Sequence, residues 1–481
     1  MRIIYFDIDT LRADHLGCYG YGRPTSPTID AVAADGVRFT NVYASDLPCL
    51  PSRTALSSGR LGIHNGVAGH GGTAAAPFPE GRERGFRSRD AAETWASQMQ
   101  AVGLWTASIS TFPERHSAYH FLAGFHESYN LGTRGLETAD QVADVAVEWL
   151  GRNAGRPDWF LHVHMWDPHT PYRTPESFGE PFAGMPAPAW LDEDVRAHHW
   201  SLPGPHSAQE ITGFGPRPHW QGYPRQPLVA GDMAQVQRMF DGYDTGVRYV
   251  DHYIGVVLGH LARLGMEDDV AVIISADHGE TLGELGIYCD HQTADHHVAR
   301  VPMIIRWPGL EAGVDDSLHY QVDVAATVLE LSGGTVPERW DGRSFRTSLD
   351  AHEYAGRESL VLTQGAWTAQ RAVRFADWIF IRTFHDSYHG FPDTMLFDLN
   401  GDPHEQHDLS VQRSDVTTKA TDLLEEWRCT AIGRSPDAVD PLDTVLAEGD
   451  PWHARWRPAE YDEWLEQTGR ASWVNRAAAA D

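Results

Sequence analysis

The chain has 481 residues and a formal net charge of −29, and 42% of its residues are hydrophobic. This length exceeds what one hydrophobic core usually holds, which favours a large α/β domain with a smaller companion. The negative charge argues against nucleic acid and anionic membranes as partners, because both bind basic surfaces. An anionic substrate would need a local positive site built from Arg and His, since Lys419 is the only lysine.

The sequence shows no targeting or membrane signal. No apolar signal region precedes the first charged residues, and no run of about 20 apolar residues follows, so we expect a soluble, cytoplasmic protein. The cysteines are few and irregularly spaced, which favours reduced thiols over a disulfide framework or a zinc motif. They are Cys18, Cys49, Cys289 and Cys429.

Short apolar runs that end in polar residues predict buried parallel strands. They occupy residues 3–6, 159–165 and 270–276. Segments with apolar residues at helical spacing lie between them, at 138–150 and 234–264. Because strands and helices alternate, we predict an α/β fold, a large mainly parallel sheet sandwiched by helices. Ligands bind at the carboxyl ends of the strands in such sheets.

A smaller unit is predicted after residue 345. Short alternating strands followed by a helix indicate a C-terminal antiparallel-sheet subdomain. The strands are expected at 359–363, 370–375 and 378–383, and the helix at 416–429. We therefore divide the chain into an α/β domain (1–345), the small sheet with its helix (346–430) and an extension rich in Trp and Pro (431–481).

The extension carries four tryptophans, which are Trp452, Trp456, Trp464 and Trp473. Aromatic residues of this kind either close a pocket or pack against a second copy of the chain in a homo-oligomer. The sequence leaves both roles open.

Cys49 lies in the run Pro-Cys-Leu-Pro-Ser-Arg at residues 48–53. A lone cysteine is more often a small buried apolar residue than a nucleophile. Here we expect Ser52 to cap a helix that begins near Arg53 and ends at Gly59. The thiol would then lie beside a helix N-terminus and a guanidinium.

Polar residues at two predicted strand ends suit a divalent cation. Asp7 and Asp9 follow the first strand, and Asp277 and His278 follow the strand at 270–276. Carboxylate oxygens with one imidazole are typical ligands of Ca²⁺, Mg²⁺ or Mn²⁺. The alternative is that these aspartates only cap the helices that follow them.

His169 lies in a loop stiffened by Pro168 and Pro171. A histidine held in this way suits a general acid or a donor to a developing anion. The alternative is a bystander, since the chain has 26 histidines.

Taken in order, these segments resemble the sulfatase family of the alkaline-phosphatase-like superfamily. Residues 49–53 match the family's C-x-P-x-R signature. Further similarity lies at 9–20, 25–30, 36–41, 277–280, 300–302 and 396–405. The resemblance runs from residue 1 to about residue 430 and implies the family's fold and activity.

In that family a formylglycine-generating enzyme oxidises the signature cysteine to formylglycine, and the resemblance implies this enzyme as a maturation partner. One hydroxyl of the hydrated aldehyde, activated by one divalent cation, attacks sulfur and forms a covalent sulfo-enzyme ester. The second hydroxyl then expels sulfate. The implied reaction is hydrolysis of a small-molecule or saccharide sulfate monoester, with Ca²⁺ as the preferred cation and Mn²⁺ or Mg²⁺ as alternatives.

The resemblance also assigns the metal ligands. It implies that Asp9, Asp277, His278 and modified Cys49 hold the cation, with Thr10 in place of a second consecutive aspartate. Asp7 has no counterpart in the family.

Other positions are implied to act on the nucleophile or the substrate. Arg53 matches the arginine that steadies the hydrated aldehyde, and His169 matches a histidine near the leaving group. His291 falls where the family commonly has a lysine that touches substrate oxygens.

The chain departs from a G-K-W-H run found in many sulfatases, since residues 106–113 lack both its lysine and its histidine. Thr111 offers a neutral hydroxyl in their place, and Arg115, His116 and His70 are candidates to restore charge toward the substrate. Because imidazoles replace ammonium groups, we expect activity that responds to pH around 6 to 7.

Two alternatives remain at this point. Phosphonate monoester hydrolases and phosphodiesterases resemble sulfatases in using the same centre, and their monoanionic esters need no more positive charge than a sulfate ester does. A non-catalytic binding homologue is the second alternative. The combined presence of Cys49, Arg53 and the metal set argues against it.

Overall fold

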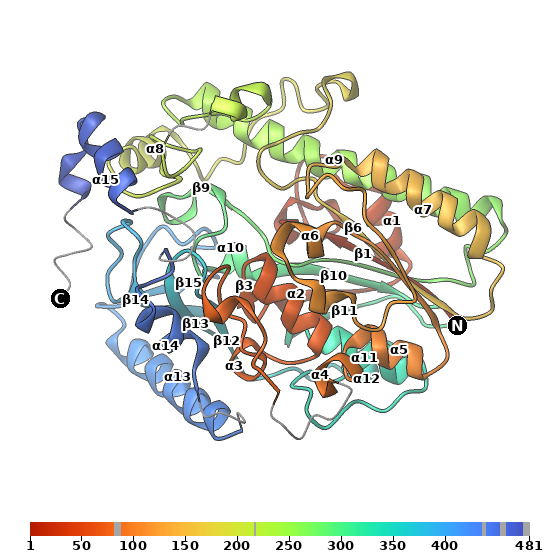
Figure 1. Cartoon of the computed structure of the whole chain (residues 1–481). Helices are drawn as coiled ribbons and strands as arrows, with labels where there is room; N and C mark the ends of the chain where they lie inside the picture. Colours follow the sequence, from red (N-terminus) through yellow and green to blue (C-terminus); the bar gives the residue numbers. More distant parts are fainter. Residues whose placement is uncertain (81–87, 216–217, 435–438, 453–457, 475–481) are drawn as a thin grey trace.

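The computed structural model describes residues 1–80, 88–215, 218–434, 439–452 and 458–474 (Figure 1). Its larger sheet has eight strands in the order β11-β2-β10-β7-β1-β6-β4-β5. The strands are β1 (Arg2–Ile8), β2 (Val37–Tyr43), β4 (Trp105–Ile109), β5 (Glu127–Tyr129), β6 (Trp159–Met165), β7 (Ala271–Ala276), β10 (Arg300–Arg306) and β11 (Gly313–Tyr320). Only β10 runs antiparallel to both of its neighbours within this sheet. The predicted mainly parallel sheet is confirmed.

Helices cover both faces of this sheet, as predicted. One layer contains α1, α7 and α9, and the other contains α2, α5 and α11 (Figure 1). Their bounds are α1 (Pro27–Ala34), α2 (Cys49–Ser58), α5 (Trp95–Ala101), α7 (Ala139–Asn153), α9 (Met233–Arg263) and α11 (Asp323–Leu331). A capping box between Thr138 and Gln141 begins α7, and Asp232 caps α9 through the backbone N–H of Gln235.

Shorter elements connect these layers. They are α3 (Gly62–Asn65), α4 (Arg89–Ala92), α6 (Phe112–His116), α8 (Glu193–His199), α10 (His296–Ala299), α12 (Arg346–Asp350), and the two-stranded sheet of β8 (Thr281–Leu282) and β9 (Tyr288–Asp290).

Three central strands determine where the site lies. β1 pairs in parallel with β6 on one side and β7 on the other, with Asp7 opposite both His164 and Ser275. All three strands are almost fully buried. Because they end at the same edge, the residues that follow them meet there.

The smaller sheet has the order β15-β14-β13-β12-β3. Its antiparallel part is β12 (Ser359–Gln364), β13 (Ala369–Phe375), β14 (Trp378–His385) and β15 (Thr394–Asp398), with α13 (Ser414–Arg434) packed on it. The fifth strand, β3 (Asp46–Leu47), comes from the segment just before Cys49 and pairs in parallel with β12. The small sheet is therefore joined through β3 to α2, the helix that begins at Cys49.

The C-terminal extension packs on its own chain through α14 (Pro441–Ala447) and α15 (Pro458–Gln467). Trp452 and Trp473 are buried in an apolar cluster with Tyr388, against which Trp464 also packs. Trp456 lies outside the described residues.

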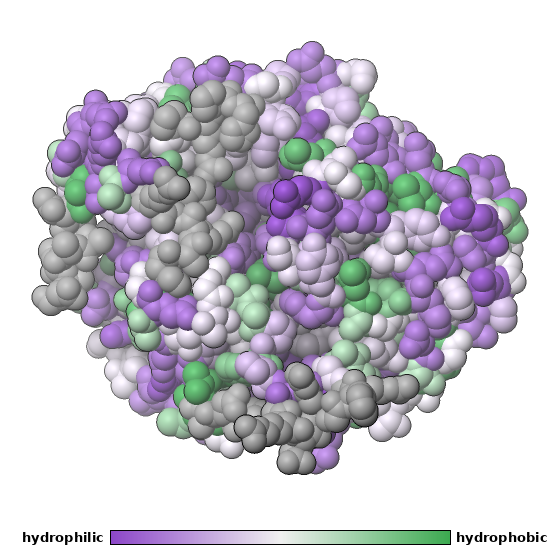
Figure 2. Space-filling model, in the orientation of Figure 1, coloured by the Kyte–Doolittle hydropathy of each residue, from purple (hydrophilic) through white to green (hydrophobic). Residues whose placement is uncertain are grey.

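The visible face of the molecule is largely hydrophilic, with hydrophobic residues in small separate groups (Figure 2). In the part of the chain that the structure describes, no helix combines the length and the apolar character needed to cross a membrane.

Candidate active site

Cys49 is the first residue of α2 and is 2% exposed. The helix begins there and not near Arg53, because Pro51 is tolerated in a first turn, where backbone N–H groups have no helical partner. Ser52 is therefore inside the helix and does not cap it; its hydroxyl donates to the Asp277 carbonyl oxygen at 2.6 Å. The predicted helix end is confirmed, since Gly59 has the left-handed conformation with φ 66°.

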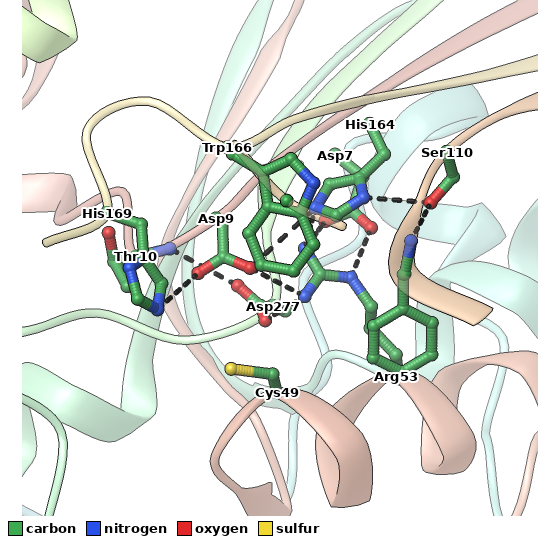
Figure 3. Close-up of polar contacts among 12 residues, drawn as sticks. Asp7, Asp9, Thr10, Cys49, Arg53, Ser110, His164, Trp166, His169 and Asp277 are labelled. Atoms are coloured by element: carbon green, nitrogen blue, oxygen red, sulfur yellow. Dashed lines mark hydrogen bonds and ion pairs between the residues drawn. The ribbon is translucent and has the colours of Figure 1, made fainter. Parts of the chain in front are cut away.

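The predicted metal ligands converge on this cysteine. Asp9 and Asp277 follow the neighbouring strands β1 and β7, and both face Cys49 (Figure 3). The thiol sulfur lies 3.1 Å from Nε2 of His278. Ligand atoms of Asp9, Cys49, Asp277 and His278 all lie within 4.8 Å of one another. Thr10 follows Asp9 in the chain, and its backbone N–H donates to Oδ1 of Asp277 at 3.3 Å.

Arg53 lies on the same helix, and its guanidinium points toward the carboxylates of Asp7, Asp9 and Asp277 (Figure 3). Its Nε donates to Asp7 at 2.9 Å, and its Nη1 donates to Asp9 at 2.9 Å and to Asp277. Its Nη2 donates to His164 at 2.8 Å. One guanidinium thus faces three buried carboxylates, so the cluster carries two excess negative charges when all three are ionised.

The pKa values of the aspartates reflect this charge imbalance. Burial alone would raise the pKa of Asp7, but Arg53, His162 and His164 together outweigh burial and leave that pKa well below the ordinary value. For Asp277, burial raises the pKa well above the ordinary value, and repulsion from Asp9 adds to this against the pull of Arg53.

The residues fit a divalent cation. Oδ1 of Asp9 is fully buried and has no hydrogen-bond partner among the described residues, and the same holds for the Thr10 hydroxyl. A buried carboxylate oxygen without a partner is costly. A divalent cation beside Asp9 and Asp277 would satisfy that oxygen and cancel the two excess charges.

His169 and His291 also lie at this centre. Nε2 of His169 is 4.0 Å from Oδ1 of Asp9, and the His291 ring centroid is 4.5 Å from that of His278. Burial lowers the pKa of His169 and of His291 to about 3. Both imidazoles are therefore neutral near pH 7, and the expected titration around pH 6 to 7 is wrong for them, because the sequence does not reveal how deeply they are buried.

The remaining predicted substrate residues lie around Trp166. Thr111 is fully buried, and its hydroxyl accepts from the Trp166 indole at 2.9 Å and donates to Glu137. Both partners are protein groups, so this geometry favours a supporting role over the predicted substrate contact. The Arg115 guanidinium lies 4.8 Å from the centre of the Trp166 ring.

His70 and His116 lie beside each other, and His70 contacts the residue that follows Cys49. Nε2 of His70 accepts from the backbone N–H of Leu50 at 3.3 Å, and the rings of His70 and His116 are 5.1 Å apart. Both side chains are partly exposed, and their role as substrate contacts stays a prediction.

Comparison with known proteins gives two family models that match this chain. The model described as Sulfatase matches residues 2–334, and the one described as N-sulphoglucosamine sulphohydrolase, C-terminal, matches residues 283–429. The first covers more than half of the chain. The chain belongs to the sulfatase family.

Individual relatives agree with this assignment. The N-acetylglucosamine-6-O-sulfatase of Bacteroides thetaiotaomicron is 22% identical, and the match covers 93% of this chain and 89% of the relative. A solved sulfatase-fold structure in complex with D-glucosamine-2-N,6-O-disulfate has a TM-score of 0.71 at 19% identity and covers 91% of this chain and 99% of its own. A phosphonate monoester hydrolase from Silicibacter pomeroyi has a TM-score of 0.64 at 20% identity, covering 91% and 96%.

As a sulfatase, the protein is a sulfuric ester hydrolase. This confirms the family and the enzyme class that the sequence motifs predict, and it sets aside the non-catalytic binding homologue.

Some residues of this sulfatase centre were missed from the sequence. Asp7 has no counterpart in the family, yet its carboxylate accepts from Arg53, and His164 joins the same network by accepting from Arg53 and donating to Ser110 at 2.9 Å. One signal was present, since His162 and His164 alternate within a strand that is otherwise apolar. Buried parallel strands seldom carry such residues without a polar partner.

Proposed function

We propose that this sulfatase hydrolyses a sulfate monoester of a saccharide or another small alcohol, with residue 49 as the nucleophile after conversion of Cys49 to formylglycine. The observation that carries the proposal is the convergence of Cys49, His278, Asp9 and Asp277 within 4.8 Å. A formylglycine-generating enzyme is then a required partner.

Hydrated formylglycine at residue 49 would supply one hydroxyl to attack sulfur and a second to permit release of sulfate, and a divalent cation, Ca²⁺ before Mn²⁺ or Mg²⁺, would polarise the reacting oxygens when bound. Asp9, Asp277 and His278 would hold this cation, since oxygen ligands dominate the set.

The unmodified thiol is poorly suited to the same task. Burial raises the pKa of Cys49 well above its ordinary value, and the charges of Asp9 and Asp277 raise it further. A thiol acts as a nucleophile only when ionised. In the site without a bound cation, the cysteine itself is therefore a poor nucleophile.

Arg53 and His169 orient the centre. Arg53 fixes Asp9 and Asp277 through Nη1, which leaves Oδ1 of Asp9 without a partner among the described residues, while Oδ1 of Asp277 accepts from the backbone N–H of Thr10. His169 donates from Nδ1 to the carbonyl oxygen of Thr170, which leaves Nε2 as an acceptor directed toward Asp9. In this tautomer His169 accepts a proton from a hydroxyl more readily than it gives one to a leaving group.

A saccharide leaving group is supported by the relatives' names, which describe sulfated hexosamines as what those proteins act on or bind. A second candidate is hydrolysis of a phosphonate monoester or phosphodiester. It is supported by the phosphonate monoester hydrolase neighbour, whereas the lack of lysine does not separate the two candidates, since both ester types are monoanions.

The test is a substrate panel on protein co-produced with a formylglycine-generating enzyme, with conversion verified by mass spectrometry of the Cys49 peptide. We expect an aryl sulfate to be hydrolysed with a higher kcat/KM than an aryl phosphodiester or a phosphonate monoester. The reverse order would favour the second candidate, and no turnover of any ester by converted protein would reject both.

A further inference from the structure

The pair formed by Cys49 and His278 borders two different groups of ligands. On one side are the carboxylates of Asp9 and Asp277, which form the set considered above. On the other side is His291, one ring nitrogen of which lies within 4.8 Å of both the Cys49 sulfur and a His278 nitrogen. All three of these residues are buried.

Hydrogen bonds present the right atoms on this imidazole side. Nδ1 of His278 donates to the carbonyl oxygen of Gly279 at 2.7 Å, so Nε2 carries a lone pair and faces the sulfur at 3.1 Å. Fixing one ring nitrogen in this way is how proteins orient histidine ligands of metals. Nδ1 of His291 is buried and has no hydrogen-bond partner in the described part of the chain; its nearest acidic group is Oδ1 of Asp290, at 3.6 Å.

The ligand atoms on the two sides differ in chemistry. Sulfur with two imidazole nitrogens is a soft donor set that suits Zn²⁺ and not Ca²⁺ or Mg²⁺, which prefer oxygen. With Nδ1 bonded to Gly279, Nε2 of His278 is the unprotonated nitrogen, which is the form of imidazole that binds metals.

We propose that the unconverted protein has a soft-metal site formed by Cys49, His278 and His291, which takes Zn²⁺ before maturation. On binding, the thiol proton passes to solvent and a bond forms between sulfur and the metal, with no oxidant or reductant needed. A bound divalent cation offsets the raised pKa of a buried thiol, because a coordinating thiol is deprotonated outright.

Conversion of Cys49 removes the sulfur and with it the soft character of the site. The metal preference of this chain then changes at maturation, from Zn²⁺ on the imidazole side to an oxygen-preferring cation on the carboxylate side. Spacing in the sequence could not indicate this site, since Cys49 and His278 are 229 residues apart.

The test uses the full chain prepared without the formylglycine-generating enzyme, stripped of metal, and titrated with Co²⁺ as a spectroscopic probe and then with Zn²⁺. We expect a near-ultraviolet thiolate-to-cobalt absorption band that Zn²⁺ abolishes by displacement and that excess Ca²⁺ does not. The band should be missing from fully converted protein.

Variants assign the ligands. Cys49→Ser should remove the band, and His291→Gln should weaken Zn²⁺ binding by about tenfold to a hundredfold. His319→Gln is the matched control, since His319 is similarly buried but bonds Asp315 within β11, at the edge of the larger sheet, and it should bind Zn²⁺ as the parent does.

Absence of the band in unconverted protein, or equal Zn²⁺ affinity in the parent and His291→Gln, would overturn the proposal. Neither measurement needs a sulfate ester or turnover. Failure of this site is therefore distinguishable from failure of the proposed sulfatase activity.

Discussion

Arg53 is the residue that holds the negative charges of the active site together. It is almost fully buried and pairs with Asp7, Asp9 and Asp277, whose side chains are equally inaccessible. A buried charge that loses its partner is far more costly than an exposed one, because water does not replace the lost interaction.

We therefore predict that Arg53→Gln lowers the free energy of unfolding at pH 7 by about 3–5 kcal/mol. The control is Arg152→Gln, because Arg152 forms an exposed pair with Glu148 four residues away. That change should stay within about 0.5 kcal/mol. Urea denaturation of both variants measures the difference, and equal losses would show that the buried network contributes no more than a surface pair.

At the scale of elements, the turn after β7 places His278. Gly279 follows it at a point where a Cβ would lie 1.9 Å from the carbonyl oxygen of His297. The backbone N–H of Gly279 also donates to the carbonyl oxygen of Val298 at 2.8 Å. The turn and the segment that contains α10 are therefore in direct contact, with no room for a side chain.

We predict that Gly279→Ala destabilises the protein by about 1–3 kcal/mol, because the backbone of the neighbouring segment must move. Gly22→Ala provides the comparison, since no described atom lies within 4 Å of a Cβ at that position. It should be neutral or stabilising by up to about 1 kcal/mol. Thermal unfolding of the two variants under the same conditions tests this, and a loss at Gly22 as large as that at Gly279 would count against the steric argument.

Long periodic elements were predictable from the sequence, whereas short and pairwise features were not. The apolar pattern placed α7, α9, β6 and the hairpin strands within a few residues of their observed bounds. β3 was missed because two residues carry no periodicity. The start of α2 was misplaced because a proline at 51 can lie inside a first turn as well as before it.

The features of the site also divide into those that the sequence predicts and those that it does not. Cys49, Asp9, Asp277 and His278 were predicted from motifs, and the structure brings them together. The partnership of Asp7 with Arg53, and the neutral state of His291, depend on contacts and burial that arise only when distant segments pack.

On the scale of the whole molecule, buried histidines link stability to pH. His389 donates from Nε2 to Oε1 of Gln292 at 2.8 Å, and burial lowers its pKa from 6.5 to about 3. His297 and His199 are also buried, with pKa values lowered by burial to about 3 and about 4. Below pH 6.5 the unfolded chain binds protons that the folded chain does not. The stabilisation is thus complete above that pH and is lost as the pH falls toward the folded-state values.

We predict that the free energy of unfolding decreases between pH 7 and pH 5, with His389 contributing about 2 kcal/mol of the loss. His389→Asn should remove that contribution, so its loss between the two pH values should be smaller by about the same amount. Denaturant titrations at both pH values measure this, and identical pH dependence in parent and variant would contradict a neutral buried His389.

The proposed sulfatase activity depends on residue 49. The most direct measurement is sulfate release from an aryl sulfate by preparations that differ in the converted fraction of Cys49, determined by mass spectrometry of the peptide that contains it. We predict that turnover rises in proportion to that fraction and is abolished in Cys49→Ala. Equal turnover by converted and unconverted protein, or retained turnover in Cys49→Ala, would contradict the assignment of residue 49 as the nucleophile.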